Sequence, residues 1–107
     1  GYAATQHAQE RWPDRQVGVG HHHAHIAACL GEHGWPLHGG KVLGIALDGI
    51  GMGEDGSFWG GEFLLADYRQ AQRVGTFKPV CLPGGDLAAR EPWRNTYAQL
   101  MAEMGWP

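Results

Sequence analysis

The sequence lacks the features that mark membrane proteins, nucleic-acid-binding proteins and disulfide-stabilised proteins. No apolar run approaches the ~20 residues of a membrane-spanning helix, so we expect no membrane contact. Eight Lys and Arg against eleven Asp and Glu give a net charge of −3, and without a basic field we expect no nucleic-acid partner. The two cysteines, Cys29 and Cys81, form no Cys-x-x-Cys pair. They indicate neither a thiolate zinc site nor a disulfide framework, so we expect a reducing, cytoplasmic location.

The sequence also begins without a methionine or a signal sequence, and it ends on Gly-Trp-Pro. Its 107 residues are enough for one modest domain. Hydrophobic residues make up 43% and charged residues 18%, which is typical of a globular protein. We interpret residues 1–107 as a single partial domain of a larger protein.

Two residue types are in excess. Glycine accounts for 18 of the 107 residues, against an ordinary share of ~7%, and it lacks the three-residue period of collagen. Histidine occurs seven times, and four of these residues fall within positions 21–25. The functional hypotheses below rest mainly on these glycines and histidines.

The pattern of apolar and turn-forming residues predicts helices on either side of a group of strands. Helices are predicted at residues 2–11, 21–33 and 93–104. Strands are predicted at residues 16–20, 42–47, 57–68 and 73–78. The apolar run at 42–47 is expected to be buried on both faces of its sheet, and Asp55-Gly56 favours a hairpin turn. The fold class is therefore α/β of the α+β kind, an antiparallel β-meander flanked by helices.

The histidine run places two imidazoles where they can share a metal ion. His21 and His25 are four residues apart, so on a helix their β-carbons lie about 5–6 Å apart on one face. Two imidazoles at this spacing can hold one ion at about 2.0–2.1 Å from each nitrogen, whereas His22 and His23 point elsewhere. Position 22 is not Glu, so the general base of the metalloprotease motif is missing. A purification-tag remnant is the simpler alternative, but Ala24 and the helical context argue against it.

The histidine pair needs at least one further ligand, and Asp48 is the best candidate. It ends a predicted strand and is followed by Gly49, where backbone can approach a ligand closely. We predict His21, His25 and Asp48 as metal ligands and catalytic residues. Glu62, in the next strand, is either a further ligand or a carboxylate at the rim of the site.

The segment GIGMGEDG, residues 49–56, contains four glycines. Backbone N–H groups that are free of neighbouring β-carbons can point at an anion such as phosphate. The segment matches neither the Walker pattern nor the dinucleotide-binding fingerprint, and on its own a hairpin turn explains it better.

Charged residues also cluster where the last predicted helix begins. Asp86, Arg90 and Arg94 are candidate contacts for an anionic cofactor, because arginine can grip phosphate or carboxylate in a fork. The alternative is helix capping by Asp86 or Glu91, with local ion pairs. Trp59 and Trp93 are expected to belong to the core.

Three strings in this sequence resemble the carbamoyltransferase domain of the HypF family of hydrogenase maturation proteins. They are GHHHAHIAACLGEHG at 20–34, ALDGIGMGEDGSFWGGEFLLADY at 46–68 and LPGGDLAAREPWRN at 82–95. They occur in the order of the family, and with YAATQHAQE at 2–10 they cover nearly the whole chain.

The resemblance implies a fold related to the actin and sugar-kinase nucleotide-binding superfamily. It also implies an ATP-dependent enzyme that uses carbamoyl phosphate, forms carbamoyl adenylate at another domain, and passes the carbamoyl group to the C-terminal cysteine of the partner HypE. Dehydration there yields the cyanide ligands of nickel-iron hydrogenase. In that scheme His21 and His25 match the metal-binding pair, Asp48 matches an acidic metal or phosphate contact, and Gly49 and Gly51 line the nucleotide phosphates. The ion implied is divalent: zinc, iron or magnesium.

Two other hypotheses remain beside the enzyme. The chain could be a non-catalytic, histidine-rich metal-binding or interaction module, or a structural β-meander whose histidines are merely exposed. The other domains of the HypF family do not occur within these residues. We therefore expect the isolated chain to be inactive in the full reaction.

Overall fold

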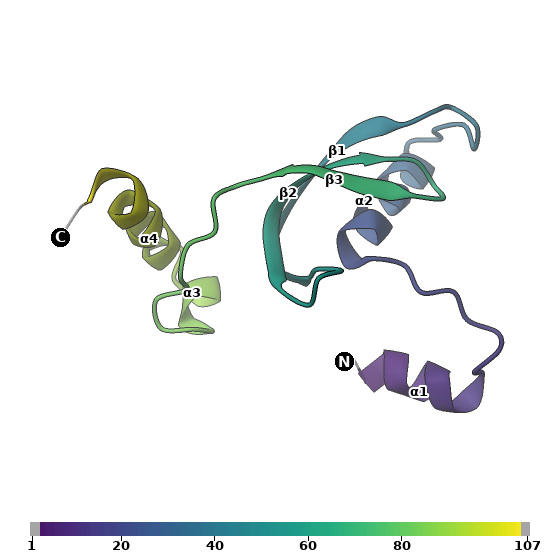
Figure 1. The fold of residues 1–107 in the computed structure, drawn as a ribbon, viewed down its shortest axis with the longest axis horizontal. Coiled ribbons are helices and arrows are strands. Elements are labelled where there is room, and N and C mark those ends of the chain that lie inside the picture. Colours follow the sequence, from purple (N-terminus) through teal and green to yellow (C-terminus); the bar gives the residue numbers. More distant parts are fainter. Residues whose placement is uncertain (1–2, 106–107) are drawn as a thin grey trace.

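The computed structural model describes residues 3–105, which fold into helices around a small antiparallel sheet (Figure 1). In chain order the elements are α1 (Ala3–Arg11), α2 (His21–Glu32), β1 (Val42–Met52), β2 (Phe58–Ala66), β3 (Ala71–Thr76), α3 (Leu87–Arg90) and α4 (Trp93–Met104). The predicted α+β class is confirmed, with helices flanking a β-meander.

The sheet has the order β1-β2-β3, and both strand pairs are antiparallel. The β1–β2 turn lies at the predicted Asp55-Gly56 pair, where the Gly53 N–H donates to the Ser57 carbonyl at 2.8 Å and Gly56 adopts a φ of 78°. Pairing of β1 with β2 is regular as far as Leu47, which faces Gly61, and resumes at Gly51. The interruption between them releases Asp48 and the two residues after it from the regular ladder.

Helix α2 packs on one face of the sheet and forms the core with it. The buried apolar residues are Ile26 and Leu30 from α2 and Leu64 and Ala66 from β2, with Trp59 and other half-buried residues around them. Gly44 of β1 lets the helix approach closely, because an ideal Cβ placed there would lie 2.7 Å from Ile26 Cγ1. This contact fixes the spacing between α2 and β1, the two elements that carry the candidate site.

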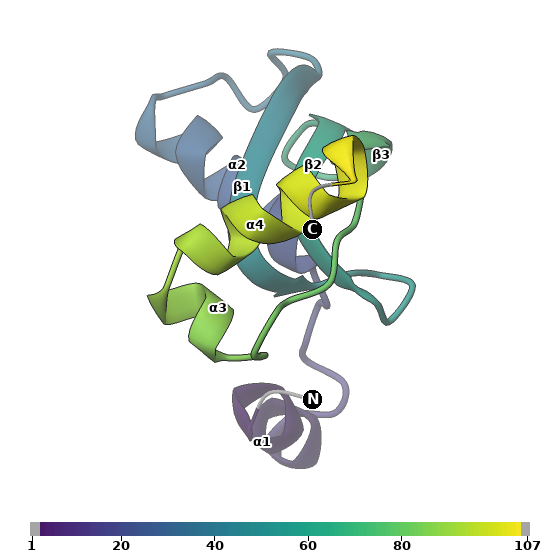
Figure 2. The same ribbon diagram turned by 90° about the vertical axis from the view of Figure 1, so that its left-hand side faces the viewer.

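The opposite face of β1 is not covered by any described residue. Its outward side chains Leu43, Ile45 and Leu47 are exposed, so the expectation that the run at 42–47 is buried on both faces is wrong. The radius of gyration is 16.6 Å, whereas a compact domain of this length has about 13 Å. Helix α1 buries none of its residues and lies apart from the sheet (Figures 1 and 2), and α4 lies toward the other end of the molecule (Figure 1).

Several local predictions differ from the structure. The predicted strand at 16–20 is wrong, because no strand within residues 3–105 pairs with this segment and its Val17 and Val19 are exposed. The short helix α3 was not predicted. The first residue of the helix predicted at 2–11, Tyr2, lies outside the described residues, and the rest is confirmed as α1.

Helix α4 begins at Trp93 and ends at Met104, as predicted, and Gly105 closes it in the left-handed conformation with a φ of 62°. Its apolar side chains are nevertheless exposed, and Ala98 is the buried residue of the helix. Trp93 is 58% exposed, so its expected place in the core is wrong, whereas Trp59 does pack against the core.

Two absences hold for the described residues. None of their helices is both long and apolar enough to cross a membrane. Cys29 and Cys81 are both free thiols at exposed positions.

Candidate metal centre

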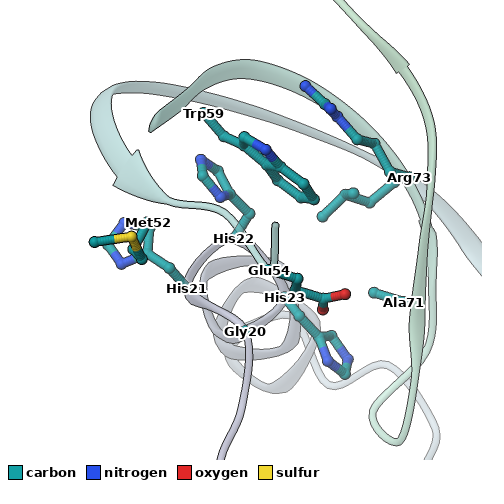
Figure 3. Close-up of a pocket in the computed structure, with 10 residues that line it drawn as sticks. Gly20, His21, His22, His23, Met52, Glu54, Trp59, Ala71 and Arg73 are labelled. Carbon is teal, nitrogen blue, oxygen red and sulfur yellow. The ribbon is translucent and has the colours of Figure 1, made fainter. Parts of the chain in front are cut away.

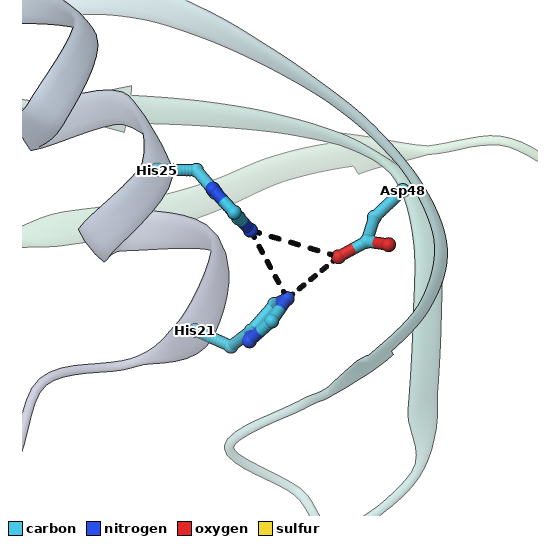
Figure 4. Close-up of side chains that lie close together, drawn as sticks. All are labelled: His21, His25 and Asp48. Carbon is cyan, nitrogen blue, oxygen red and sulfur yellow. Dashed lines mark hydrogen bonds and ion pairs between the residues drawn. The ribbon is translucent and has the colours of Figure 1, made fainter.

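His21 and His25 of α2 and Asp48 of β1 converge on one point between the helix and the sheet (Figure 4). The Nε2 atom of His21 lies 2.6 Å from Asp48 Oδ2 and 3.3 Å from His25 Nε2. His25 Nε2 lies 3.8 Å from the same carboxylate oxygen. The structure thus brings together the three residues that the sequence singled out as ligands, and their binding of an ion stays a prediction.

The donor atoms fit a divalent metal ion. Donors held at about 2.0–2.2 Å from one ion lie roughly 3–3.5 Å from each other. The distances from His25 Nε2 to His21 Nε2 (3.3 Å) and to Asp48 Oδ2 (3.8 Å) are close to this range. The shorter contact between His21 and Asp48 is a hydrogen bond that an ion would replace. Three protein donors with room for a further ligand are the usual arrangement of catalytic zinc sites, and the His25 side chain is 63% exposed to solvent.

The Asp48 carboxylate is held in its ionised form. Its hydrogen bond with His21 lowers the pKa of Asp48 below the usual value, against the opposing effect of partial burial. The neighbouring backbone N–H groups of Gly49 and Ile50 lower the pKa further. An anionic oxygen is therefore ready for a cation at neutral pH.

The glycines after Asp48 have different surroundings. An ideal Cβ on Gly51 would lie 2.7 Å from His21 Cδ2 and 2.8 Å from His22 Nε2, so only glycine fits against the two rings. A Cβ on Gly49 would meet nothing within 4 Å. The predicted phosphate contacts of Gly49 and Gly51 stay predictions, and packing alone explains Gly51.

A groove of about 280 Å³ opens on the other side of Asp48. Its walls come from the end of β1, from β2 and β3, and from α4, and they include Gly49, Thr76, Lys78, Asn95 and Gln99. The Lys78 ammonium, 2.9 Å from the Glu103 carboxylate, brings a positive charge to this wall just after the end of β3. A small polar ligand could lie in the groove and reach Asp48.

The charged residues near α4 do not join the histidines. Arg94 donates to the Glu91 carboxylate at 2.6 Å and lies over the Trp93 ring, and the groove is lined from α4 by Asn95 and Gln99 instead. Asp86 begins α3 without a side-chain capping bond, and Arg90 ends it. The cofactor contacts predicted for Asp86, Arg90 and Arg94 stay predictions, whereas the expected local ion pair is present at Arg94.

Glu62 has a role that neither sequence interpretation anticipated. It is 1% exposed, and its carboxylate accepts hydrogen bonds from the Arg73 guanidinium and from the Thr76 hydroxyl. The Arg73 guanidinium in turn lies over the Trp59 ring, 4.1 Å from its centre. The alternation of Glu62, Leu64 and Ala66 along β2, all buried, was the sequence signal for this inward position.

Two further histidines of α2 are buried. His23 Nε2 lies 2.7 Å from the Asp67 carbonyl, at the turn between β2 and β3. His22 packs beneath the end of β1, against Trp59. Both rings point away from His25, as the helical spacing predicts, but the spacing alone does not reveal that they are enclosed.

Two family models match the chain. One, described as "Carbamoyltransferase, Kae1-like Domain, second subdomain", matches residues 44–107, and another, described as "HypF Kae1-like domain", matches residues 1–32. His21 and His25 thus lie in the region matched by one model, and Asp48 lies in the region matched by the other.

Relatives and a solved structure agree with these models. Carbamoyltransferase HypF of Rhodobacter capsulatus is 58% identical over 86 residues, which are 80% of this chain and 12% of that protein. Carbamoyltransferase HypF2 of Cupriavidus necator is 50% identical over 104 residues, covering 94% of this chain and 12% of that protein. A crystal structure of full-length HypF in the phosphate- and nucleotide-bound form superposes with a TM-score of 0.75 at 38% identity, covering 98% of this chain and 13% of that one. The chain spans about an eighth of the length of these proteins.

Proposed function

Because this chain belongs to the HypF family of carbamoyltransferases, we propose that it supplies a metal-binding part of the site from which a carbamoyl group is transferred. The donor is carbamoyl adenylate, made from carbamoyl phosphate and ATP elsewhere in HypF. The acceptor is the C-terminal cysteine of the partner protein HypE, on the route to the cyanide ligands of nickel-iron hydrogenase. This part of the reaction takes place in the cytoplasm.

The observation that carries the proposal is the convergence of His21, His25 and Asp48 beside an open groove. Two imidazoles and one carboxylate suit zinc or iron better than magnesium, which prefers oxygen donors. A divalent ion bound here would act as a Lewis acid that stabilises negative charge on a carbonyl or phosphoryl oxygen. The neighbouring groove is where the proposed adenylate lies, since its wall carries the Lys78 ammonium, which pairs with Glu103, and the Asn95 amide, one N–H of which donates to the Ala88 carbonyl.

The residues of this chain hold and orient the reactants in the proposed transfer. The acceptor thiol gives up its proton to water, its sulfur forms a bond to the carbamoyl carbon, and the bond from that carbon to the phosphate oxygen breaks as AMP leaves with the electron pair. The Asp48 carboxylate is held in place by its hydrogen bond with His21. A ligand fixed in this way would keep a bound cation in position, and the cation would then stabilise the charge that develops on the leaving phosphate without rearrangement.

The test uses a chimera in which this chain replaces the matching segment of Rhodobacter capsulatus HypF, since the two are 58% identical over that segment. Replacing His21 and His25 with Ala should abolish carbamoyl transfer to HypE, while carbamoyl adenylate formation by the other domains persists. His38→Ala is the matched control, because His38 is an exposed histidine that lies outside the cluster.

Transfer that survives the loss of both histidines would remove them from catalysis. Tight metal binding by the unaltered chain, combined with such surviving transfer, would favour the non-catalytic metal-binding module. Loss of transfer in His38→Ala to the same extent would show that the assay reports general damage to the fold.

A further inference from the structure

His22 is the most enclosed of the four histidines in α2, and one of its nitrogens has no partner. Its exposed fraction is 2%, and its Nε2 atom is the buried side-chain nitrogen or oxygen that lacks a hydrogen bond among the described residues. Buried polar atoms are nearly always hydrogen-bonded, and the exceptions mark bound water, a ligand or a functional constraint. In a neutral imidazole ring this nitrogen is either a donor or an acceptor, according to the tautomer.

The His22 ring is wedged between the two elements that form the metal centre. One edge faces the Gly51 backbone, at a spacing that leaves no room for a β-carbon. The ring lies 5.8 Å from the Trp59 ring on one side and 5.1 Å, edge on, from the His21 ring on the other. Trp59 is itself covered by Arg73, which the buried Glu62 holds in place. Arg73, Trp59 and His22 therefore form a stack of side chains, and the His21 ring packs against the His22 end of it.

A small cavity of about 30 Å³ adjoins this stack (Figure 3). Both His21 and His22 line it, together with Glu54, Trp59 and Arg73. A cavity needs roughly 10–15 Å³ to hold one water molecule, which in turn needs two or more polar partners. His22 and Glu54 both line the cavity and both carry polar side-chain atoms, so the cavity has the size and the polar lining of a water site.

We propose that His22 is a positioning residue of the candidate metal centre: its buried ring, completed by a water molecule in the adjoining cavity, holds His21 in place for metal binding. The inference rests on the proposed metal centre and adds a residue that touches neither the ion nor the substrate. Partners of this outer kind typically change metal affinity by about 10–100-fold when they are removed.

The two buried histidines make a matched pair for the test. In His22→Phe a ring of similar shape remains and no hydrogen bond to protein is lost, although the extra ring atom lies on the edge that faces the Gly51 backbone. In His23→Phe the bond to the Asp67 carbonyl is lost, but the stack of rings that supports His21 is left intact. His22→Gln restores a polar group near the position of the unpaired nitrogen.

Cobalt(II) serves as the probe, with the full chain titrated and the ligand-field spectrum and melting temperature recorded for each variant. We expect His22→Phe to bind cobalt about 10–100-fold more weakly than the unaltered chain, with a changed spectrum. His23→Phe should melt at a lower temperature than the unaltered chain while keeping its cobalt affinity and spectrum. His22→Gln should recover part of the affinity lost in His22→Phe.

Three results would overturn the inference: cobalt affinity unchanged in His22→Phe, equal weakening in His23→Phe, or no recovery in His22→Gln. If the unaltered chain bound no cobalt, the proposed metal centre would fail and this inference with it. Normal binding by the unaltered chain and by His22→Phe would remove the role of His22 alone and leave the metal centre standing.

Discussion

Gly51 separates the end of β1 from two histidine rings, and adding a single methyl group there should disturb the metal centre. In Gly51→Ala the new Cβ would lie 2.7 Å from His21 Cδ2 and 2.8 Å from His22 Nε2, where ordinary contacts begin near 3.4 Å. The neighbouring Gly49→Ala is the matched control, because its Cβ would meet nothing within 4 Å. Neither glycine has a positive φ, so alanine can adopt the backbone conformation at both positions.

The expected magnitude follows from this overlap. The nearest atom to the new Cβ is Cε1 of the buried His22 ring, and relief of the His21 contact alone requires a movement of about 0.7 Å, the difference between 3.4 and 2.7 Å. Overpacking of this kind costs about 1–3 kcal/mol, or roughly 4–15 °C of melting temperature in a domain of ~100 residues. Metal sites tolerate donor displacements of only about 0.2 Å, so the affinity for a divalent ion should fall by at least about tenfold. Gly49→Ala should leave the affinity unchanged and raise stability slightly, by about 0.4–1 kcal/mol.

Isothermal titration with zinc, together with thermal unfolding of the metal-free chain, measures both effects. Equal zinc affinity in the two alanine variants would refute the reasoning, since it would show that His21 is not confined by the Gly51 backbone. A lower melting temperature for Gly49→Ala than for Gly51→Ala would contradict the packing argument independently of metal binding.

Three further predictions concern the framework of the site. Glu62→Gln should lower the free energy of unfolding in urea by about 1–3 kcal/mol, and the loss should lie toward the lower end because the Arg73 side chain is 31% exposed. If the losses in Glu62→Gln and Arg73→Met simply added in the double variant, the two side chains would not be coupled. Backbone N–H groups lower the pKa of Asp67, so Asp67→Ala should be less stable than the unaltered chain at neutral pH. The difference in stability between the two proteins should shrink as the pH falls below about 4 and passes through the lowered pKa of Asp67, where the carboxylate becomes protonated. A difference in melting temperature that did not change with pH would argue against a role for the ionised carboxylate. Gly44→Ala should cost about 1–3 kcal/mol, because its Cβ would overlap Ile26, and an unchanged melting temperature would contradict the close approach of α2 to β1.

Short sequence patterns correctly predicted helices, turns and helix ends, because these depend mainly on residues that are adjacent in the chain. The four-residue spacing of His21 and His25 requires only a helix, and Asp55-Gly56 requires only a tight turn. The end of α4 at Gly105 follows from the same kind of local preference for a left-handed residue. These features were therefore predicted correctly from short stretches of sequence.

The burial of residues, which depends on how helices and strands pack against each other, was predicted less well. The apolar run of β1 indicates a strand, but it does not indicate that α2 covers one face and leaves Leu43 and Ile45 open on the other. Residues 16–20 have the composition of a strand but no partner to pair with. His22 and Glu62 are polar residues that packing encloses, and their burial depends on how the helix meets the sheet.

The metal centre itself depends on that same meeting of helix and sheet. Its two histidines lie in residues matched by one family model, and its aspartate lies in residues matched by another. Neither segment holds all three donors, so the site exists only while α2 stays packed on β1 at the distance that Gly44 and Ile26 allow. Gly44→Ala, although remote from the donors in sequence, should therefore weaken metal binding as well as the fold, whereas a change on the exposed face of β1, such as Leu43→Thr, should leave the affinity unchanged.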